Sequence, residues 1–323
     1  MALPASVPWT SAPKLQWSPA RRGELAALGL YFALVVGLTD IFNIRLGVEL
    51  LTLVVVVAAA AISRQLRLFV RDWWFALVGL VMWNLSGPIA AYSPITPHLD
   101  LMMQFDRLLL FGRDPVSVVQ LNLAGPQVGW LDIVTGILYN MHLGEPYIAG
   151  YFLWRLNRAV YLQFITSVLI LLVVGFITFI LFPAIPPWMA SADYGKVQGV
   201  QNLFGRVLRW HPMPFHGTPI FYFFQFRGDA VAAMPSEHAA FPFLEFLAFY
   251  QVNRRAAGLL ALWVVAVLFT VLYLGMHWAV DALAGWLYAL LIFAFVRWFA
   301  CRSSNQGTSL AFVSGSTLHK ETT

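Results

Sequence analysis

The chain has 323 residues, of which 60% are hydrophobic and only 11% are charged. A soluble globular domain carries about 25% charged residues, so this composition excludes an ordinary soluble protein and indicates an integral membrane protein. The net charge of +5 does not predict a nucleic-acid partner, because the distribution of charge across a membrane matters more than its sum. The single cysteine, Cys301, excludes an internal disulfide.

The ends of the chain differ from its middle. Residues 1–24 lack the apolar core and small-residue cleavage site of a signal peptide, so we expect the first helix to stay as an anchor. The expected organisation is a mobile cytoplasmic N-terminus at 1–24, N-terminal membrane helices with an outer loop at 25–126, a core at 127–302 with an outer loop at 183–237, and a mobile tail at 303–323.

Long apolar runs dominate the chain. A membrane-spanning helix needs about 20 largely apolar residues. Such runs, with one shorter segment, lie at 25–43, 47–62, 72–91, 127–151, 160–182, 238–252, 256–276 and 278–299. The sequence therefore predicts an all-α fold: a polytopic membrane helix bundle of about eight transmembrane helices.

The basic residues give this bundle an orientation. With the N-terminus in the cytoplasm, every connection that alternation assigns to the cytoplasm is basic, as the positive-inside rule requires. Leaving out the short run 238–252 would move Arg254 and Arg255 to the outer side. Both termini are therefore expected in the cytoplasm, and His238, His277 and Asp281 on the non-cytoplasmic face.

His277 and Asp281 are the first candidate catalytic pair. They are four residues apart, so on a helix they lie on one face, one turn apart. The carboxylate can accept the proton of one imidazole nitrogen and leave the other nitrogen with a free lone pair, as a nucleophile or base requires. A buried His–Asp pair that only joins two helices is the alternative reading.

The stretch "MPSEH", which ends at His238, is the second candidate. Pro235 suits the first turn of a helix, and the free amides after Ser236 then form an anion-binding helix end. His238 in that turn can donate a proton to a bound anion. A capped helix start with an interfacial histidine is the alternative.

Together these stretches resemble a known family. "AAMPSEHAA" and "YLGMHWAVDALAG" resemble the second and third signatures of the type 2 phosphatidic acid phosphatase superfamily, which includes vanadium haloperoxidases. "FITFILFPAIPPWMA" resembles the branch that contains inositol phosphorylceramide synthases. The resemblance implies a six-helix-type catalytic core without a metal, in which His277 is the nucleophile that becomes a phosphohistidine, Asp281 orients it, and His238 is the general acid and then the base.

The phosphate-binding residues depart from the family pattern. The Lys-x6-Arg-Pro signature is absent, and the Ser-Arg pair expected before the third signature is Thr270-Val271. The predicted topology places Arg155 and Arg158 at cytoplasmic helix ends. The outer basic candidates are Arg107, Arg113, Lys196, Arg206, Arg209 and Arg227, with Arg227 and then Arg113 favoured. The expected binding set is Ser236, Glu237, Gly228, Asp229, Arg227 and Arg113.

The leading functional hypothesis is a lipid phosphotransferase or phosphatase in the bilayer, with a phospholipid or sphingolipid-type substrate and no cofactor. Transfer of phosphoinositol to a ceramide-like alcohol and hydrolysis by water both fit the sequence. A membrane lipid-binding or transport protein without catalysis is the third hypothesis. A bacterial inner membrane is the expected location, and the sequence leaves the oligomeric state open.

Overall fold

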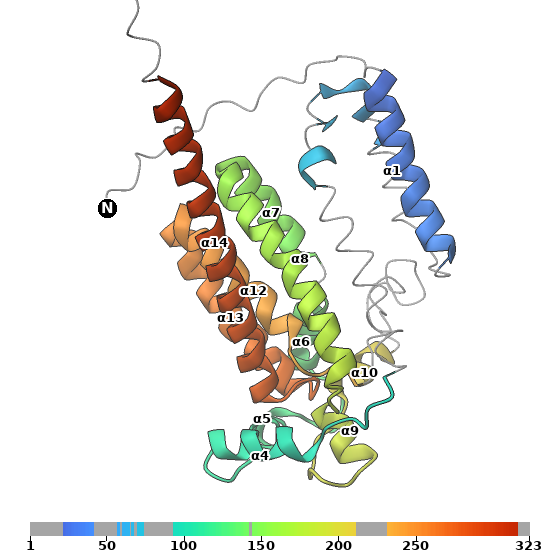
Figure 1. Cartoon of the computed structure of the whole chain (residues 1–323). Helices are drawn as coiled ribbons and strands as arrows, with labels where there is room; N and C mark the ends of the chain where they lie inside the picture. Colours follow the sequence, from blue (N-terminus) through green and yellow to red (C-terminus); the bar gives the residue numbers. More distant parts are fainter. Residues whose placement is uncertain are drawn as a thin grey trace, which may run out of the picture. The chain divides into compact units, whose positions relative to one another are not determined.

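The computed structural model describes residues 22–41, scattered residues between 57 and 73, and residues 93–141, 144–210 and 231–315 (Figure 1). The chain divides into two compact units, residues 1–81 and 82–323. Most of the predicted spans 47–62 and 72–91, and residues 211–230 of the outer loop, lie outside the described residues.

The first unit contains the first predicted span. Helix α1 runs from Arg22–Ile41 and covers most of the apolar run 25–43. Glu24 in its first turn forms an ion pair with Arg67 of the same unit, at 3.4 Å between Oε2 and Nε. Both side chains belong to the part of the chain that the sequence assigns to the cytoplasmic end.

The second unit is built on four long helices, α8 (Arg158–Leu181), α12 (Glu237–Val252), α13 (Arg254–Tyr273) and α14 (Ala279–Gly315). Asn157 and Asn253 begin α8 and α13, because each side chain accepts two backbone N–H bonds from the first turn. Among the described residues, α8, α13 and the part of α14 from Ala279–Arg302 are long and apolar enough to cross a membrane. The described part of the chain is thus helical with membrane spans, while the count of eight stays a prediction.

The predicted span 127–151 is two helices, not one. Helix α6 runs from Trp130–Met141 and α7 from Glu145–Leu156. Pro146 lies in the first turn of α7, where its missing N–H leaves no unmade bond, and Gly144 precedes that turn. Each helix is 12 residues, about 18 Å long, so neither alone crosses a hydrocarbon core of about 30 Å.

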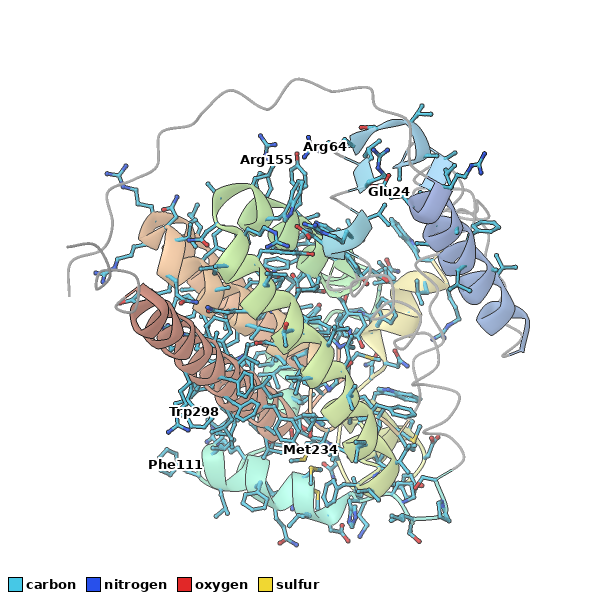
Figure 2. All side chains as sticks on the ribbon, turned by 45° about the horizontal axis from the view of Figure 1, so that its top comes forward. Glu24, Arg64, Phe111, Arg155, Met234 and Trp298 are labelled. Carbon is cyan, nitrogen blue, oxygen red and sulfur yellow. The ribbon has the colours of Figure 1, made fainter. Side chains whose placement is uncertain are left out.

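Short helices lie at one end of this unit (Figure 1): α4 (Asp100–Leu109), α5 (Pro115–Leu123), α9 (Pro187–Ala192) and α10 (Leu203–Leu208). This is the end at which α8 and α13 finish and α12 and α14 begin. Arg155 lies at the opposite end of the unit from Met234 (Figure 2), as the predicted topology requires. In the described part of the second unit, two isolated β-bridges pair His98 with Ala184 and Ala184 with Ala232.

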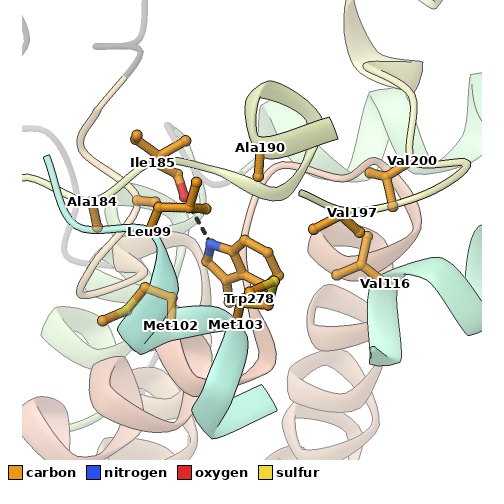
Figure 3. Close-up of a cluster of buried hydrophobic side chains, with 11 residues drawn as sticks. Leu99, Met102, Met103, Val116, Ala184, Ile185, Ala190, Val197, Val200 and Trp278 are labelled. Carbon is orange, nitrogen blue, oxygen red and sulfur yellow. Dashed lines mark hydrogen bonds between the residues drawn. The ribbon is translucent and has the colours of Figure 1, made fainter. Parts of the chain in front are cut away.

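Trp278 is the centre of the apolar core at this end (Figure 3). Its side chain is fully buried, and its indole N–H donates to the carbonyl of Ile185 at 2.7 Å. Met102 and Met103 of α4 pack in the same cluster. The core therefore holds α4 and the segment before α9 against the start of α14.

Helix α14 is longer than the predicted span 278–299. It begins at Ala279, close to the expected start, and continues to Gly315. The segment expected as a mobile tail, 303–323, thus begins within this helix.

Candidate active site

The start of α12 presents His238. Ser236 is the residue before the helix, and its hydroxyl oxygen accepts the N–H of Ala239 at 3.3 Å. Pro235 therefore stands just before the cap, not in the first turn as predicted. His238, the second residue of α12, is buried at this end of the unit.

A tight turn between α13 and α14 presents His277. The turn contains Gly275 at φ +74°, a left-handed conformation that favours glycine. A Cβ there would also lie 2.8 Å from the carbonyl oxygen of Gln201 and 2.9 Å from Nε2 of Gln120. The glycine of "YLGMH" is thus required by both backbone conformation and space.

The two predicted histidines contact each other. Nε2 of His277 lies 3.2 Å from Nδ1 of His238. Nδ1 of His277 lies 2.8 Å from the carbonyl oxygen of Ala233, and because a carbonyl only accepts, Nδ1 carries the proton of the neutral ring. Nε2 of His277 therefore holds the lone pair and faces His238, which is the tautomer that a nucleophile at Nε2 needs.

Asp281 lies behind this pair. Its Oδ2 is 3.8 Å from Nδ1 of His277, longer than a hydrogen bond, and accepts the backbone N–H of Trp278 at 2.8 Å. The expected Asp281-to-imidazole hydrogen bond is thus replaced by the bond to Ala233, with the carboxylate at ion-pair distance. The carboxylate is fully buried, so a positive charge on His277 would be stabilised more strongly here than in water.

The two sequence motifs pack directly on each other. The N–H of Ser236 donates to the backbone carbonyl of Asp281 at 2.9 Å. Gly285, one turn further along α14, lies so close to the carbonyl oxygen of Ser236 that a Cβ would collide with it. The glycine that ends the second motif therefore allows α12 and α14 to approach.

Two residues near the histidines had no motif to identify them. Tyr139 of α6 stacks on His238, with ring centroids 4.0 Å apart and planes at 18°. Asp106 of α4 is fully buried and accepts the N–H groups of Ala279 and Val280 at the start of α14, at 2.9 and 2.8 Å. Both come from helices far away in the sequence, so only the fold brings them to this site.

Most of the predicted phosphate-binding residues are not seen next to the two histidines. The Glu237 side chain is buried against Gly175 of α8. Arg113 is exposed on the turn between α4 and α5. Arg227, Gly228 and Asp229 lie outside the described residues.

Another outer basic candidate already has an acidic partner. The Nη2 atom of Arg206 lies 3.0 Å from both carboxylate oxygens of Asp132, and the Tyr273 hydroxyl donates to the same carboxylate at 2.9 Å. Arg206 thus forms a structural ion pair with Asp132. In that part, no group of three or more His, Cys, Asp or Glu residues could hold a metal ion.

The sequence model of the PAP2 superfamily matches residues 100–295, more than half of the chain. The chain belongs to the PAP2 superfamily. This match includes both histidine motifs and the helices that carry Tyr139 and Asp106. It agrees with the resemblance seen in "MPSEH" and "HWAVD".

A curated relative adds detail. The chain is 29% identical over 179 residues to a phosphoinositol dihydroceramide synthase of Bacteroides thetaiotaomicron, which covers 52% of this chain and 56% of that protein. The aligned part thus spans about half the length of the relative. The likeness is consistent with the inositol phosphorylceramide synthase-like branch. No solved structure matches the chain.

Proposed function

We propose that this protein is an integral-membrane phosphotransferase that acts on a lipid phosphate ester through a phosphohistidine at His277. The observation that carries the proposal is the contact of His277 Nε2 with His238 Nδ1 at 3.2 Å, in front of the buried Asp281. A lone pair, a proton carrier and an orienting carboxylate are the groups that this double displacement needs.

In the first half-reaction, Nε2 of His277 forms a bond to phosphorus while the bond from phosphorus to the lipid oxygen breaks. His238 gives its proton to that oxygen, so the lipid leaves as a neutral alcohol. Asp281 lies 3.8 Å from Nδ1 of His277 and stabilises the positive charge that the ring gains. Transition-state charge of this kind is stabilised most when the groups are already fixed in place.

In the second half-reaction, His238 takes the proton of the acceptor hydroxyl. The acceptor oxygen attacks phosphorus, and the bond from phosphorus to His277 Nε2 breaks. The ring returns to its neutral form with the proton on Nδ1. The proposed route moves one proton out and one proton back, and it uses no metal ion or cofactor.

The acceptor that we favour is a ceramide-like lipid alcohol, and the group transferred is phosphoinositol. The name of the Bacteroides relative supports this choice, and membership of the PAP2 superfamily is consistent with it. Ser236 and the amides of the first turn of α12 would hold the phosphate, with Arg227 and Arg113 as its proposed cations. Hydrolysis, with water as the acceptor, is the second candidate.

Product analysis tests the choice of acceptor. The full chain purified in detergent is incubated with phosphatidylinositol and ceramide, and separately with phosphatidic acid. We expect an inositol phosphorylceramide-type product in the first reaction. Release of inorganic phosphate from phosphatidic acid alone would instead assign the protein as a phosphatase.

The His277→Ala variant tests catalysis itself. We expect loss of turnover and of acid-labile phosphate bound to the protein, because no other described group stands where His277 Nε2 does. Turnover at the level of the natural chain would rule out His277 as the nucleophile. Absence of turnover in the natural chain itself would favour a binding or transport protein.

We also propose that the protein lies in a bacterial inner membrane with both termini in the cytoplasm and the histidines on the non-cytoplasmic face. The basic cytoplasmic connections support this orientation. A reporter fused to the C-terminus tests it: an extracytoplasmic reporter would overturn the orientation.

A further inference from the structure

Asp106 forms an unusual cap on the helix that carries Asp281. A helix start leaves its first N–H groups without partners inside the helix, and a residue next to it in sequence usually supplies them. Here the partner comes from another helix: Oδ2 of Asp106 accepts the N–H of Ala279 at 2.9 Å, and Oδ1 accepts that of Val280 at 2.8 Å. The carboxylate is fully buried, so water does not replace it.

Asp281 completes the same cap. Its Oδ2 accepts the N–H of Trp278 at 2.8 Å, so two carboxylates satisfy three successive N–H groups. Two negative groups at one helix start repel each other, and the positive end of the helix dipole offsets part of that repulsion. The position of Asp281 therefore depends on where Asp106 holds the first turn.

His277 is directly before this turn. Its backbone N–H donates to the carbonyl of Val271 at 3.4 Å, and its ring nitrogen Nδ1 bonds the carbonyl of Ala233. The direction in which its side chain leaves the backbone is thus set by the end of α13 on one side and by the start of α14 on the other. Asp106 fixes the second of these.

Helix α4 is itself fixed in place. Met102 and Met103 are buried in the cluster around Trp278 (Figure 3), and Trp278 bonds the carbonyl of Ile185. The Asp106 carboxylate therefore reaches α14 from a helix that cannot easily move away.

We propose that Asp106 is a positioning residue for the His277–Asp281 pair, which it orients by capping α14 from α4. This inference rests on the proposed function, because it concerns the same site. It assigns Asp106 no contact with the lipid.

The variant that tests the inference is Asp106→Asn in the full-length chain. Asparagine keeps the shape, but its amide group offers a donor to an N–H that needs an acceptor. We expect a fall in kcat of about 10- to 100-fold with KM unchanged, because misplacement of a reacting group by about 1 Å can cost about 100-fold. Asp100→Asn is the matched control: it removes a carboxylate from the same helix, but that carboxylate is exposed and pairs with Lys196 at the surface.

A second measurement does not depend on turnover. The chain has seven histidines, so ring signals of a histidine-labelled sample are few, and those that vanish in His277→Ala belong to His277. We expect Asp106→Asn to shift these signals and Asp100→Asn to leave them in place. If the natural chain turns over neither lipid, the proposed function fails, while the ring signals still decide the role of Asp106.

Three outcomes would overturn the inference. One is that Asp106→Asn has the same kcat and the same His277 ring signals as the natural chain. Another is a kcat loss that matches the loss of folded protein while the His277 signals stay in place. If Asp106→Asn does not fold, Asp106→Glu is used, which keeps the charge but moves the carboxylate; full activity with unshifted His277 signals in that variant would also contradict the proposal.

Discussion

The phenol ring of Tyr139 lies nearly parallel to the imidazole of His238, with centroids 4.0 Å apart. The stack limits the rotation of the ring that we propose as proton carrier. Tyr139→Leu removes the aromatic face, and stacking of this kind is worth about 0.5–1.5 kcal/mol. We expect kcat to fall by up to about tenfold, measured with the transfer assay. Tyr139→Phe keeps the ring and should retain most of the activity; equal losses in both variants would contradict a role for the stack.

Gly285→Ala tests the approach of α12 to α14. The added Cβ would collide with the carbonyl oxygen of Ser236, and because this is a backbone atom it can move only if the motifs separate. We expect a loss of both thermal stability and turnover, read from melting curves and the transfer assay. Gly258→Ala is the control, since a Cβ there meets nothing within 4 Å; it should be neutral or should stabilise α13 by up to about 1 kcal/mol.

The stability of the protein should depend on pH through Asp106. Burial raises the pKa of Asp106 from 3.8 to about 7, although the N–H bonds of Ala279 and Val280 lower it; the nearby carboxylates Asp281 and Asp114 raise it further. At a pH between these two pKa values, Asp106 therefore holds a proton in the folded chain that it has released in the unfolded chain. The contribution of this proton to the free energy of unfolding is complete below pH 3.8. It is lost as the pH rises to about 7.

Melting curves recorded from pH 4 to 8 check this dependence. We expect the melting temperature of the natural chain to decline more steeply with rising pH than that of Asp106→Asn, which cannot titrate at this position. Parallel curves for the two proteins would refute the assignment.

Arg206 should act on stability and not on substrate binding. Its removal in Arg206→Gln leaves the Asp132 carboxylate buried without its cation, which typically destabilises a protein by about 3–5 kcal/mol. The double variant with Asp132→Asn should recover much of this loss. We expect KM for the lipid to be unchanged in the folded fraction of both variants. A raised KM would make Arg206 a phosphate ligand after all.

The sequence predicted which motif residues lie near one another at the site. Ser236, His238, His277 and Asp281 stand at helix ends that apolar runs define, and the structure brings these ends together. The family match covers the same residues. Local spacing was sufficient because each motif residue lies within a few positions of a helix start or end.

The remaining features depend on long-range packing. Tyr139 and Asp106 reach the site from α6 and α4, and nothing in their own segments distinguishes them from other aromatic or acidic residues. The sequence also did not predict that the run 127–151 is divided into two helices. Its hydropathy continues through Gly144 and Pro146, although helix α6 ends at Met141 and α7 begins at Glu145. The hydrogen bond from His277 to Ala233 uses a backbone carbonyl, which no side-chain pattern can reveal.

The contact between His238 and His277 has a consequence for how a reaction cycle starts. At transfer, phosphorus and the departing oxygen must lie between the two rings, and each reacting atom approaches its partner to about 3–3.5 Å. The rings must then be about 6 Å apart or more, whereas their facing nitrogens are 3.2 Å apart in the structure. In the proposed mechanism, a lipid phosphate therefore enters by replacing a hydrogen bond between His277 and His238 that the protein makes with itself.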